Sequence, residues 1–345
     1  MATLIKETAI TFSDILIVPQ YSEVLSREHV NITSDMGQFK LRIPIISANM
    51  KDITGAKMAY ELSKLGALGI LHRFMSIEEN VNAFYDCMID ENSNPYSVGV
   101  SVGVKEEEKE RFLALKKAGA TIFCVDLAHG DHILAKNMLT FIRENSEKKD
   151  TYVIAGNIAT KESAMNLIEW GADCIKAGVG PGKVCLTRTN AGVGVPQLTV
   201  IKEIKEMLVE NKLNYVKLIS DGGINSSGDI AKALAYADAV MVGSILSGTS
   251  ETPGAVFQNP EGQFYKTYGG SASGENKVKS GNANRFVEGV VKTVQFKGHV
   301  KYIIRKIEDG VRSAFSYSDA KNLKEFQENV ILRMISGGGK SESKI

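Results

Sequence analysis

The chain has 345 residues, of which 43% are hydrophobic and 23% are charged, and its 41 basic side chains nearly balance 40 acidic ones. A chain of this length buries roughly three quarters of its unfolded surface, which excludes disorder over most of the sequence. The net charge of +1 excludes the broad basic field that non-specific binding to nucleic acid or to a membrane surface requires. Any anionic partner is therefore expected to be a small molecule.

Hydrophobic runs and cysteines indicate a soluble, cytoplasmic protein. The longest apolar runs, 65–71 and 239–246, fall far short of the roughly 20 residues that span a bilayer. The four cysteines lack CxxC spacing, and Cys124 and Cys174 lie within apolar runs, which is typical of buried thiols in a reducing compartment. Disulfides and structural zinc are therefore not expected.

Short apolar runs alternate with amphipathic segments along the chain. Eight runs are predicted as strands: 43–48, 68–72, 96–102, 121–127, 152–156, 174–178, 216–221 and 239–243. Seven segments are predicted as helices: 54–64, 77–88, 106–117, 133–143, 161–170, 197–210 and 227–237. Gly66, Gly119 and Gly171 follow three of these helices as stop signals. The alternation predicts right-handed βαβ units and a parallel sheet.

Eight such units favour an α/β fold of the closed (β/α)8 TIM-barrel type, with residues 1–345 forming a single catalytic domain. An open doubly wound sheet is the alternative, but it needs a nucleotide-binding glycine fingerprint after its first strand, and the sequence has none there. We expect an N-terminal extension with a hairpin over residues 1–42, a mobile flap over about 266–289, and a C-terminal tail. The chemistry of such barrels lies at the C-terminal ends of the strands.

The connection after the sixth predicted strand is the most informative segment. It spans residues 178–197, and a βα loop of nearly 20 residues is generally functional. Its glycines expose backbone N–H groups and flank Cys185, with the hydroxyl of Thr187 two residues later. Cysteine is more often a small buried residue. Because a structural thiol does not need glycine on both sides, we predict instead that Cys185 is a nucleophile placed near an anion.

This loop resembles the catalytic loop of the IMP dehydrogenase and GMP reductase family. The similar segments are GVGPGKVCLTR at 178–188 and AGVGVPQ at 191–197. Further segments resemble the family in order and spacing: TFSDILIVP at 11–19, SANM at 47–50, MSIEE at 75–79, DLAHG at 126–130, AGNIAT at 155–160, SDGGI at 220–224 and VGS at 242–244. The resemblance extends from about residue 10 to the C-terminus.

The resemblance implies that Cys185 attacks C2 of a purine nucleotide, GMP or IMP, and that hydride passes between that carbon and the nicotinamide of NADPH or NAD. It implies catalytic roles for Cys185, Thr187 and Glu288. The substrate-binding residues that it implies are Ser47, Asn157, Gly182, Lys183, Asp221, Gly222, Gly223, Gly243, Ser244, Tyr268, Gly269, Gly270 and Arg285. Asp126, Ala128 and Gly178 would bind the cofactor. The resemblance also implies a K⁺ ion held by the backbone carbonyls of Gly180, Gly182 and Cys185, and a homotetramer.

The predicted phosphate site has support from the residues themselves. Asp221-Gly222-Gly223 alone could be an ordinary turn at the end of a strand, but Gly243-Ser244 follows the next strand. Barrels commonly hold phosphate on backbone N–H groups at these two strand ends. One departure lies beside this site, because Lys183 stands where the family usually has a serine that touches the phosphate. A lysine could pair with phosphate as a point charge or could point away.

Two features separate the reductase from the dehydrogenase chemistry of the family. Dehydrogenases hydrolyse the thioimidate with water that an Arg-Tyr pair on a long flap activates, whereas residues 270–287 contain one arginine, Arg285, and no such pair. Typical dehydrogenases also insert a pair of CBS domains between the second helix and the third strand, where this chain has only residues 89–95. In the reductase, Thr187 and Glu288 would transfer the proton for the departure of ammonia. The sequence therefore favours GMP reductase.

Two alternatives remain open. The segments 11–14, 126–130 and 242–244 and the tail 335–342 resemble dehydrogenases more closely, which favours an IMP dehydrogenase without CBS domains that forms XMP and NADH from IMP, NAD and water. Lys183 and the altered flap would instead suit a catalytically silent sensor of purine nucleotides. The intact Cys185, Thr187 and Glu288 argue against the sensor.

Overall fold

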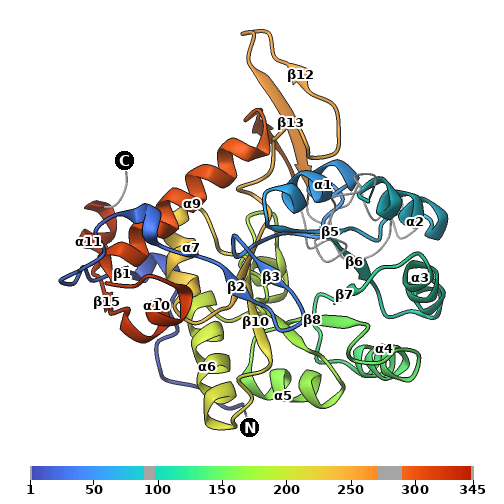
Figure 1. Cartoon of the computed structure of the whole chain (residues 1–345), viewed down its shortest axis with the longest axis horizontal. Helices are drawn as coiled ribbons and strands as arrows, with labels where there is room; N and C mark the ends of the chain where they lie inside the picture. The colour runs from blue at the N-terminus through green and yellow to red at the C-terminus, as the bar shows by residue number, and fades with distance from the viewer. Residues whose placement is uncertain (1, 89–97, 270–289, 343–345) are drawn as a thin grey trace.

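Eight parallel strands close into a barrel, in the order β10-β11-β4-β5-β6-β7-β8-β9, and helices surround it (Figure 1). The structure is a computed structural model that describes residues 2–88, 98–269 and 290–342. The barrel strands are β4 (Ile45–Ser47), β5 (Leu68–Leu71), β6 (Val98–Val102), β7 (Ile122–Asp126), β8 (Tyr152–Ile158), β9 (Cys174–Ala177), β10 (Lys217–Asp221) and β11 (Ala239–Val242). Each coincides with one predicted strand, which confirms the (β/α)8 TIM barrel.

The barrel strands are buried on both faces, which explains their continuous apolar runs in the sequence. One face fills the barrel interior with residues such as Ile46, Leu68 and Ile154. The other face packs against the helices, with Val100 and Val240 in that outer core. The two packed layers fix the strand ends, and the strand ends in turn position the site.

The seven predicted helices are all present. They are α1 (Ala56–Lys64), α2 (Ile77–Asp86), α3 (Glu106–Lys117), α4 (Ile133–Glu144), α5 (Lys161–Glu169), α6 (Gln197–Glu210) and α7 (Ser227–Leu234). The predicted stops Gly66, Gly119 and Gly171 have positive φ angles of 74°, 101° and 108°, the left-handed conformation that ends helices on glycine. No helix in the described part of the chain is long and apolar enough to span a membrane.

The helix that completes the barrel, α9 (Val300–Tyr317), is missing from the predicted set. It packs against both α7 and α1, and it buries Ile304, Ile307 and Phe315 along one face. The expectation of only a flap and a tail after the eighth strand was therefore incomplete. A long excursion separates β11 from α9, and this interrupted the strand–helix alternation on which the prediction relied.

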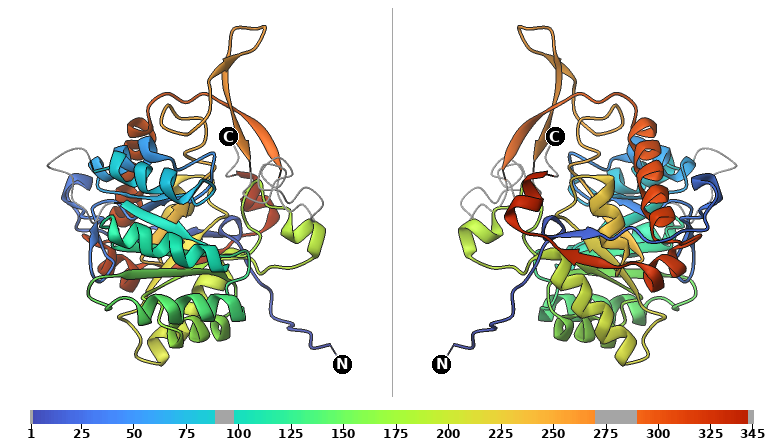
Figure 2. Two further views of the ribbon diagram at one scale, coloured as in Figure 1. Left: turned by 90° about the vertical axis from the view of Figure 1, so that its right-hand side faces the viewer. Right: turned by 90° about the vertical axis from the view of Figure 1, so that its left-hand side faces the viewer.

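That excursion forms an antiparallel sheet of β12 (Phe257–Gln258), β13 (Phe264–Gly269) and β14 (Val291–Gln295). Its β12–β13 end projects away from the barrel (Figures 1 and 2). The predicted flap at 266–289 begins inside β13, and its residues 270–289 lie outside the described residues. The backbone N–H of Gly269, the last residue of β13, donates to the Asp52 carboxylate over 2.7 Å, which ties this sheet to the loop after β4.

Segments near both ends of the chain pack against the barrel, whereas residues 2–9 are exposed and extend away from it (Figure 2). The expected N-terminal hairpin is present as β2 (Ser34–Asp35) and β3 (Lys40–Leu41), and its Met36 and Phe39 join the core of the barrel interior. Strand β1 (Ile15–Ile17) pairs with β15 (Leu332–Met334), which follows α10 (Leu323–Asn329). The glycine-rich tail forms a short helix, α11 (Gly337–Glu342).

Candidate active site

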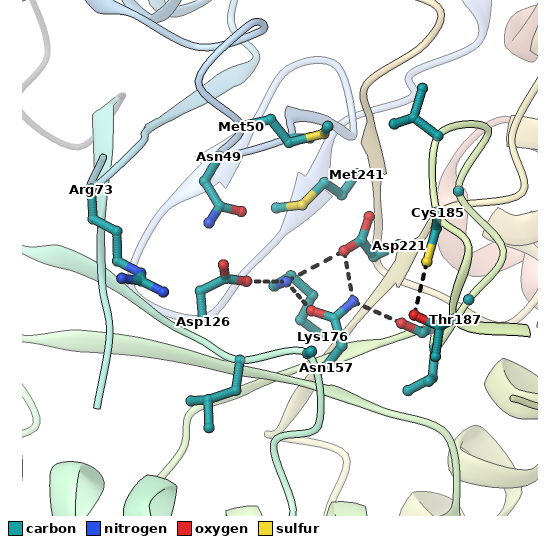
Figure 3. A pocket seen from close by; sticks show the side chains of 18 of the residues that line it. Asn49, Met50, Arg73, Asp126, Asn157, Lys176, Cys185, Thr187, Asp221 and Met241 are labelled. Atoms are coloured by element: carbon teal, nitrogen blue, oxygen red, sulfur yellow. Dashed lines mark hydrogen bonds and ion pairs between the residues drawn. The ribbon is translucent and has the colours of Figure 1, made fainter. Parts of the chain in front are cut away.

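A cavity of about 390 Å³ opens at the C-terminal ends of the barrel strands (Figure 3). The loop after β9 lines it with Cys185 and Thr187, and the Cys185 Sγ lies 3.2 Å from the Thr187 Oγ1. Cys87, Cys124 and Cys174 are buried, whereas Cys185 is partly exposed. Burial raises the pKa of Cys87 and that of Cys124 to about 12. Cys185 is therefore the cysteine that a ligand in this cavity can reach.

The loop that carries Cys185 folds back over β10. Gly178 begins it with a φ of 145°, and a Cβ at this position would lie 2.0 Å from the Asp221 carbonyl oxygen, so only glycine permits this approach. The Cys185 N–H donates to the Gly182 carbonyl over 3.0 Å, and the Arg188 guanidinium donates to the Val195 carbonyl over 2.6 Å. These contacts hold the thiol at the rim of the cavity.

The floor of the cavity contains a buried lysine that the sequence analysis missed. The side chain of Lys176 is 2% exposed, and its ammonium lies 2.9 Å from an Asp126 carboxylate oxygen and 3.3 Å from one of Asp221. It also donates to the amide oxygen of Asn157, and the Asn157 amide nitrogen donates to Asp221 over 2.8 Å. One network therefore joins Asp126, predicted to bind the cofactor, to Asn157 and Asp221, predicted to bind the nucleotide (Figure 3).

The Lys176 ammonium offsets part of the negative charge of the two carboxylates in this network. Burial opposes ionisation of Asp126, but the Lys176 ammonium and its hydrogen bond, together with the charge of Arg73, hold the pKa of Asp126 below its ordinary value. Burial also opposes the charge on Lys176, yet Asp126 and Asp221 raise the Lys176 pKa above its ordinary value. The Asp126 carboxylate is thus kept as an acceptor for ligand hydroxyl groups at neutral pH.

Strand register explains how Lys176 reaches Asp126. Gly156 on β8 pairs with Asp126 on one side and with Lys176 on the other. A Cβ at Gly156 would lie 2.3 Å from the Lys176 carbonyl oxygen and 2.8 Å from the Lys176 Cβ. Because Gly156 has no side chain, the Lys176 side chain can cross β8 at this position and reach Asp126.

Gly156→Ala is accordingly expected to lower the free energy of unfolding by about 1–3 kcal/mol, because the added methyl overpacks a rigid barrel strand. Denaturant titration measures this loss. Gly228→Ala is the control, since the nearest atom to a Cβ at this position in α7 is 3.6 Å away and alanine favours a helix. Equal unfolding midpoints for the Gly156 variant and the wild type would contradict the packing argument.

The residues predicted to bind phosphate lie together in a second, adjoining cavity of about 70 Å³. It is lined by the glycines after β10 and β11, with Lys183 and Ser244 beside them. Gly182 and the buried Tyr268 line both cavities, so one elongated ligand can reach both. The predicted residues that the structure brings to one cavity or the other are Asp126, Ala128, Asn157, Gly178, Gly180, Gly182, Lys183, Cys185, Thr187, Asp221, Gly222, Gly223, Gly243, Ser244 and Tyr268.

Several predicted residues are not brought to these cavities. Ser47 is fully buried in β4 and accepts a hydrogen bond of 2.8 Å from Thr54, and Gly269 lines neither cavity. Ala48, Asn49 and Met50, which follow Ser47 in the same motif, line the cavity. Gly270, Arg285 and Glu288 lie outside the described residues.

Sequence reasoning also missed Arg73, which lines the cavity from the loop after β5. A signal was present for Lys176, because a lysine inside an otherwise apolar strand must be paired when it is buried. Of the three backbone carbonyls predicted to bind K⁺, that of Gly182 already accepts a hydrogen bond from the Cys185 N–H. The described residues contain no cluster of three or more His, Cys, Asp or Glu side chains that could hold a metal.

Proteins of known sequence and structure resemble this chain over most of its length. A family model described as the IMP dehydrogenase / GMP reductase domain matches residues 9–345. The chain is 34% identical to inosine-5′-monophosphate dehydrogenase from Cryptosporidium parvum, covering 97% of this chain and 94% of that protein, and 33% identical to GMP reductase from Acidovorax sp. strain JS42, covering 92% and 93%.

A solved structure shows the same fold. It is a cysteine-to-alanine variant of GMP reductase from Trypanosoma brucei in complex with guanosine 5′-monophosphate, with a TM-score of 0.88, 29% identity and 98% coverage of both chains. The family model matches nearly the whole of the present chain. The relatives of the chain include both an inosine-5′-monophosphate dehydrogenase and a GMP reductase. The chain therefore belongs to the IMP dehydrogenase / GMP reductase family of oxidoreductases.

Proposed function

We propose that this protein is a GMP reductase, which converts GMP and NADPH to IMP, ammonia and NADP. The observation that carries the choice of direction is the composition of residues 270–289, which contain one arginine, Arg285, and no tyrosine. Without an Arg-Tyr pair the chain lacks the group that activates water in the dehydrogenases it resembles. The solved GMP reductase with bound GMP supports a purine nucleotide as the ligand.

The chemistry proposed for the site begins at Cys185. Its thiolate adds to C2 of GMP, the 2-amino group leaves as ammonia after taking up a proton, and a Cys185 thioimidate remains. Thr187, 3.2 Å from the sulfur, would relay that proton together with Glu288. NADPH supplies the hydride to C2, and expulsion of the thiolate releases IMP. Asp221 and Asp126, both fixed by Lys176, would accept hydrogen bonds from the two ribose groups.

Further expectations belong to this proposal. The cavity that holds Cys185 continues from the sulfur to Asp126, Ala128 and Arg73, which supports a nicotinamide nucleotide lying beside the purine. A K⁺ ion on the backbone carbonyls of Gly180, Gly182 and Cys185 and a homotetramer are proposed from the family resemblance. Light scattering and activity in K⁺ against Na⁺ buffers test these two points.

Two reaction mixtures test the proposed activity. The protein is incubated with GMP plus NADPH and separately with IMP plus NAD, and the nicotinamide absorbance is followed. We expect turnover in the first mixture. Turnover only in the second would establish an IMP dehydrogenase, the alternative favoured by the dehydrogenase relatives. Silence in both, with nucleotide still bound, would identify the silent nucleotide sensor.

Glu288→Gln is expected to slow ammonia release about 100-fold while the KM for GMP changes less than about threefold, because the glutamine cannot supply the proton that Thr187 relays to the leaving amino group. An enzyme-coupled ammonia assay measures the rate. Glu261→Gln is the control, since Glu261 is an exposed residue between β12 and β13. An unchanged rate with a higher KM would assign Glu288 to binding alone.

A further inference from the structure

A third cavity of about 330 Å³ adjoins the predicted phosphate site. We call it the lysine pocket, and define it by Lys183, Ser226, Ser227, Ser244, Lys297 and Lys306. Lys183 and Ser244 also line the phosphate cavity, so the two spaces meet at these side chains. A water molecule takes about 30 Å³ of liquid volume, and the lysine pocket is therefore large enough for a further phosphate group.

The lysine pocket carries positive charge without compensation from the described residues. Its lysines come from three places: Lys183 from the loop after β9, Lys297 from the loop after β14, and Lys306 from α9. Lys292 lines a neighbouring cavity that Lys183 and Lys297 share. No Asp or Glu among the described residues lines either space. None of the ion pairs among the described residues involves any of the four lysines.

The positive charge of Lys183 acts on Lys297 in this pocket. Burial lowers the pKa of Lys297, and the charge of Lys183 lowers it further. The Lys297 ammonium is held in place by the carbonyls of Ser244 and Ile245, at 3.1 and 2.9 Å. An ammonium has three N–H groups, so one remains for a ligand. An anion in the lysine pocket would relieve the repulsion between these lysines.

Serine hydroxyl groups and the N-terminus of α7 complete the lining of the lysine pocket. Ser226 is the N-cap of α7 and Ser227 its first residue, and both face the lysine pocket. The start of a helix carries partial positive charge, which favours anions. Asp229 in the first turn of α7 lines a different cavity, and its carboxylate accepts the Asn225 N–H over 3.0 Å.

We propose that the lysine pocket is a second phosphate subsite, which takes the β-phosphate of a purine nucleoside 5′-diphosphate. The inference rests on the proposed function in one respect, because the α-phosphate is taken to occupy the site formed by Gly222, Gly223, Gly243 and Ser244. A 5′-monophosphate bound there would leave Lys297 and Lys306 unused. A diphosphate extends past Ser244 to both of them.

Binding of GDP and GMP by the full chain tests the subsite, with isothermal titration calorimetry at low ionic strength. We expect GDP to bind roughly tenfold more tightly than GMP, the combined effect of several exposed ion pairs. Lys306→Gln is expected to remove most of this preference and to leave GMP affinity unchanged, because Lys306 lines only the lysine pocket among the described cavities. Lys301→Gln is the control, since Lys301 lies on the same helix with its ammonium 5.1 Å from the Tyr302 ring centroid.

Three results would overturn the proposal: equal affinity for the two nucleotides, a preference that survives in Lys306→Gln, or equal weakening of both nucleotides by that substitution. Adding inorganic phosphate to the GMP titration separates the sources of the anion. Tighter GMP binding in its presence would assign the lysine pocket to a free phosphate instead of a nucleoside diphosphate. Turnover of GMP with NADPH is measured separately, so that the subsite and the proposed activity are tested independently. A protein that prefers GDP but does not turn over GMP would contradict the proposed activity and support the subsite. A protein that turns over GMP but shows no preference for GDP would contradict the subsite alone.

Discussion

Cys185→Ala is expected to reduce turnover by at least about 10⁴-fold, because alanine cannot form the covalent bond to C2 on which both chemistries of the family depend. GMP affinity is expected to change little, since the ribose and phosphate contacts proposed for Asp221 and Ser244 do not involve the sulfur. Steady-state rates and calorimetry measure the two quantities. A variant with more than about 1% of the wild-type rate would remove Cys185 from the mechanism.

Cys87→Ala is the matched control for this substitution. Cys87 is a buried thiol at the end of α2, where its Sγ lies 3.1 Å from the Ala83 carbonyl oxygen, and it lines none of the cavities described here. Its replacement is expected to cost about 1 kcal/mol of stability through lost packing and to leave turnover intact. Loss of turnover in both variants would indicate damage to the fold instead of loss of the nucleophile.

Lys176→Met is expected to lower the free energy of unfolding by about 3 kcal/mol and to reduce kcat/KM at least about 100-fold. Removing one partner of a buried ion-pair network leaves the other charges uncompensated, here the carboxylates of Asp126 and Asp221. Both keep some contact with solvent, at 22% and 21% side-chain exposure, so the lower end of the usual cost applies. Lys202→Met is the control, because its pair with Glu206 on α6 is exposed and worth about 0.5 kcal/mol or less.

The stability loss in Lys176→Met should depend on pH. In the wild type the folded-state pKa of Asp126 lies below its ordinary value, so its contribution to stability is present above about pH 4 and is lost as pH falls through the folded pKa. In the variant Lys176 no longer opposes the effect of burial, and only the charge of Arg73 and the hydrogen bond from Asn49 still do. The pKa of Asp126 therefore rises relative to the wild type, so the charged carboxylate costs stability at neutral pH and the protonated one does not. Urea titrations at pH 7 and below pH 4 should therefore show a smaller difference between the proteins in acid. A difference independent of pH would exclude this coupling.

The local sequence predicted the parts of the site that depend on chain neighbours. Cys185 and Thr187 are two residues apart in one loop, and Gly222 and Gly243 directly follow strands, so their positions at the barrel rim follow from the strand assignment. Ser47 does not line the described cavities because alternation along a short strand decides which side chains face them, and β4 ends at this residue. The position of Arg73 depends on the path of the loop after β5, which no local pattern specifies.

Hydrophobic periodicity and the glycines that end helices were sufficient by themselves to predict the eight strands, seven helices and the closed barrel. The reason is that burial on both faces of a parallel sheet gives every strand a continuous apolar run, which is visible in the local sequence. Only the tertiary structure decided that Lys176 neutralises Asp126 and Asp221, residues far apart along the chain, and that α9 completes the ring beside α1 and α7. Charge pairing and the closure of a barrel join strands and helices from opposite ends of the sequence. Such contacts depend on three-dimensional distance, which a one-dimensional pattern does not contain.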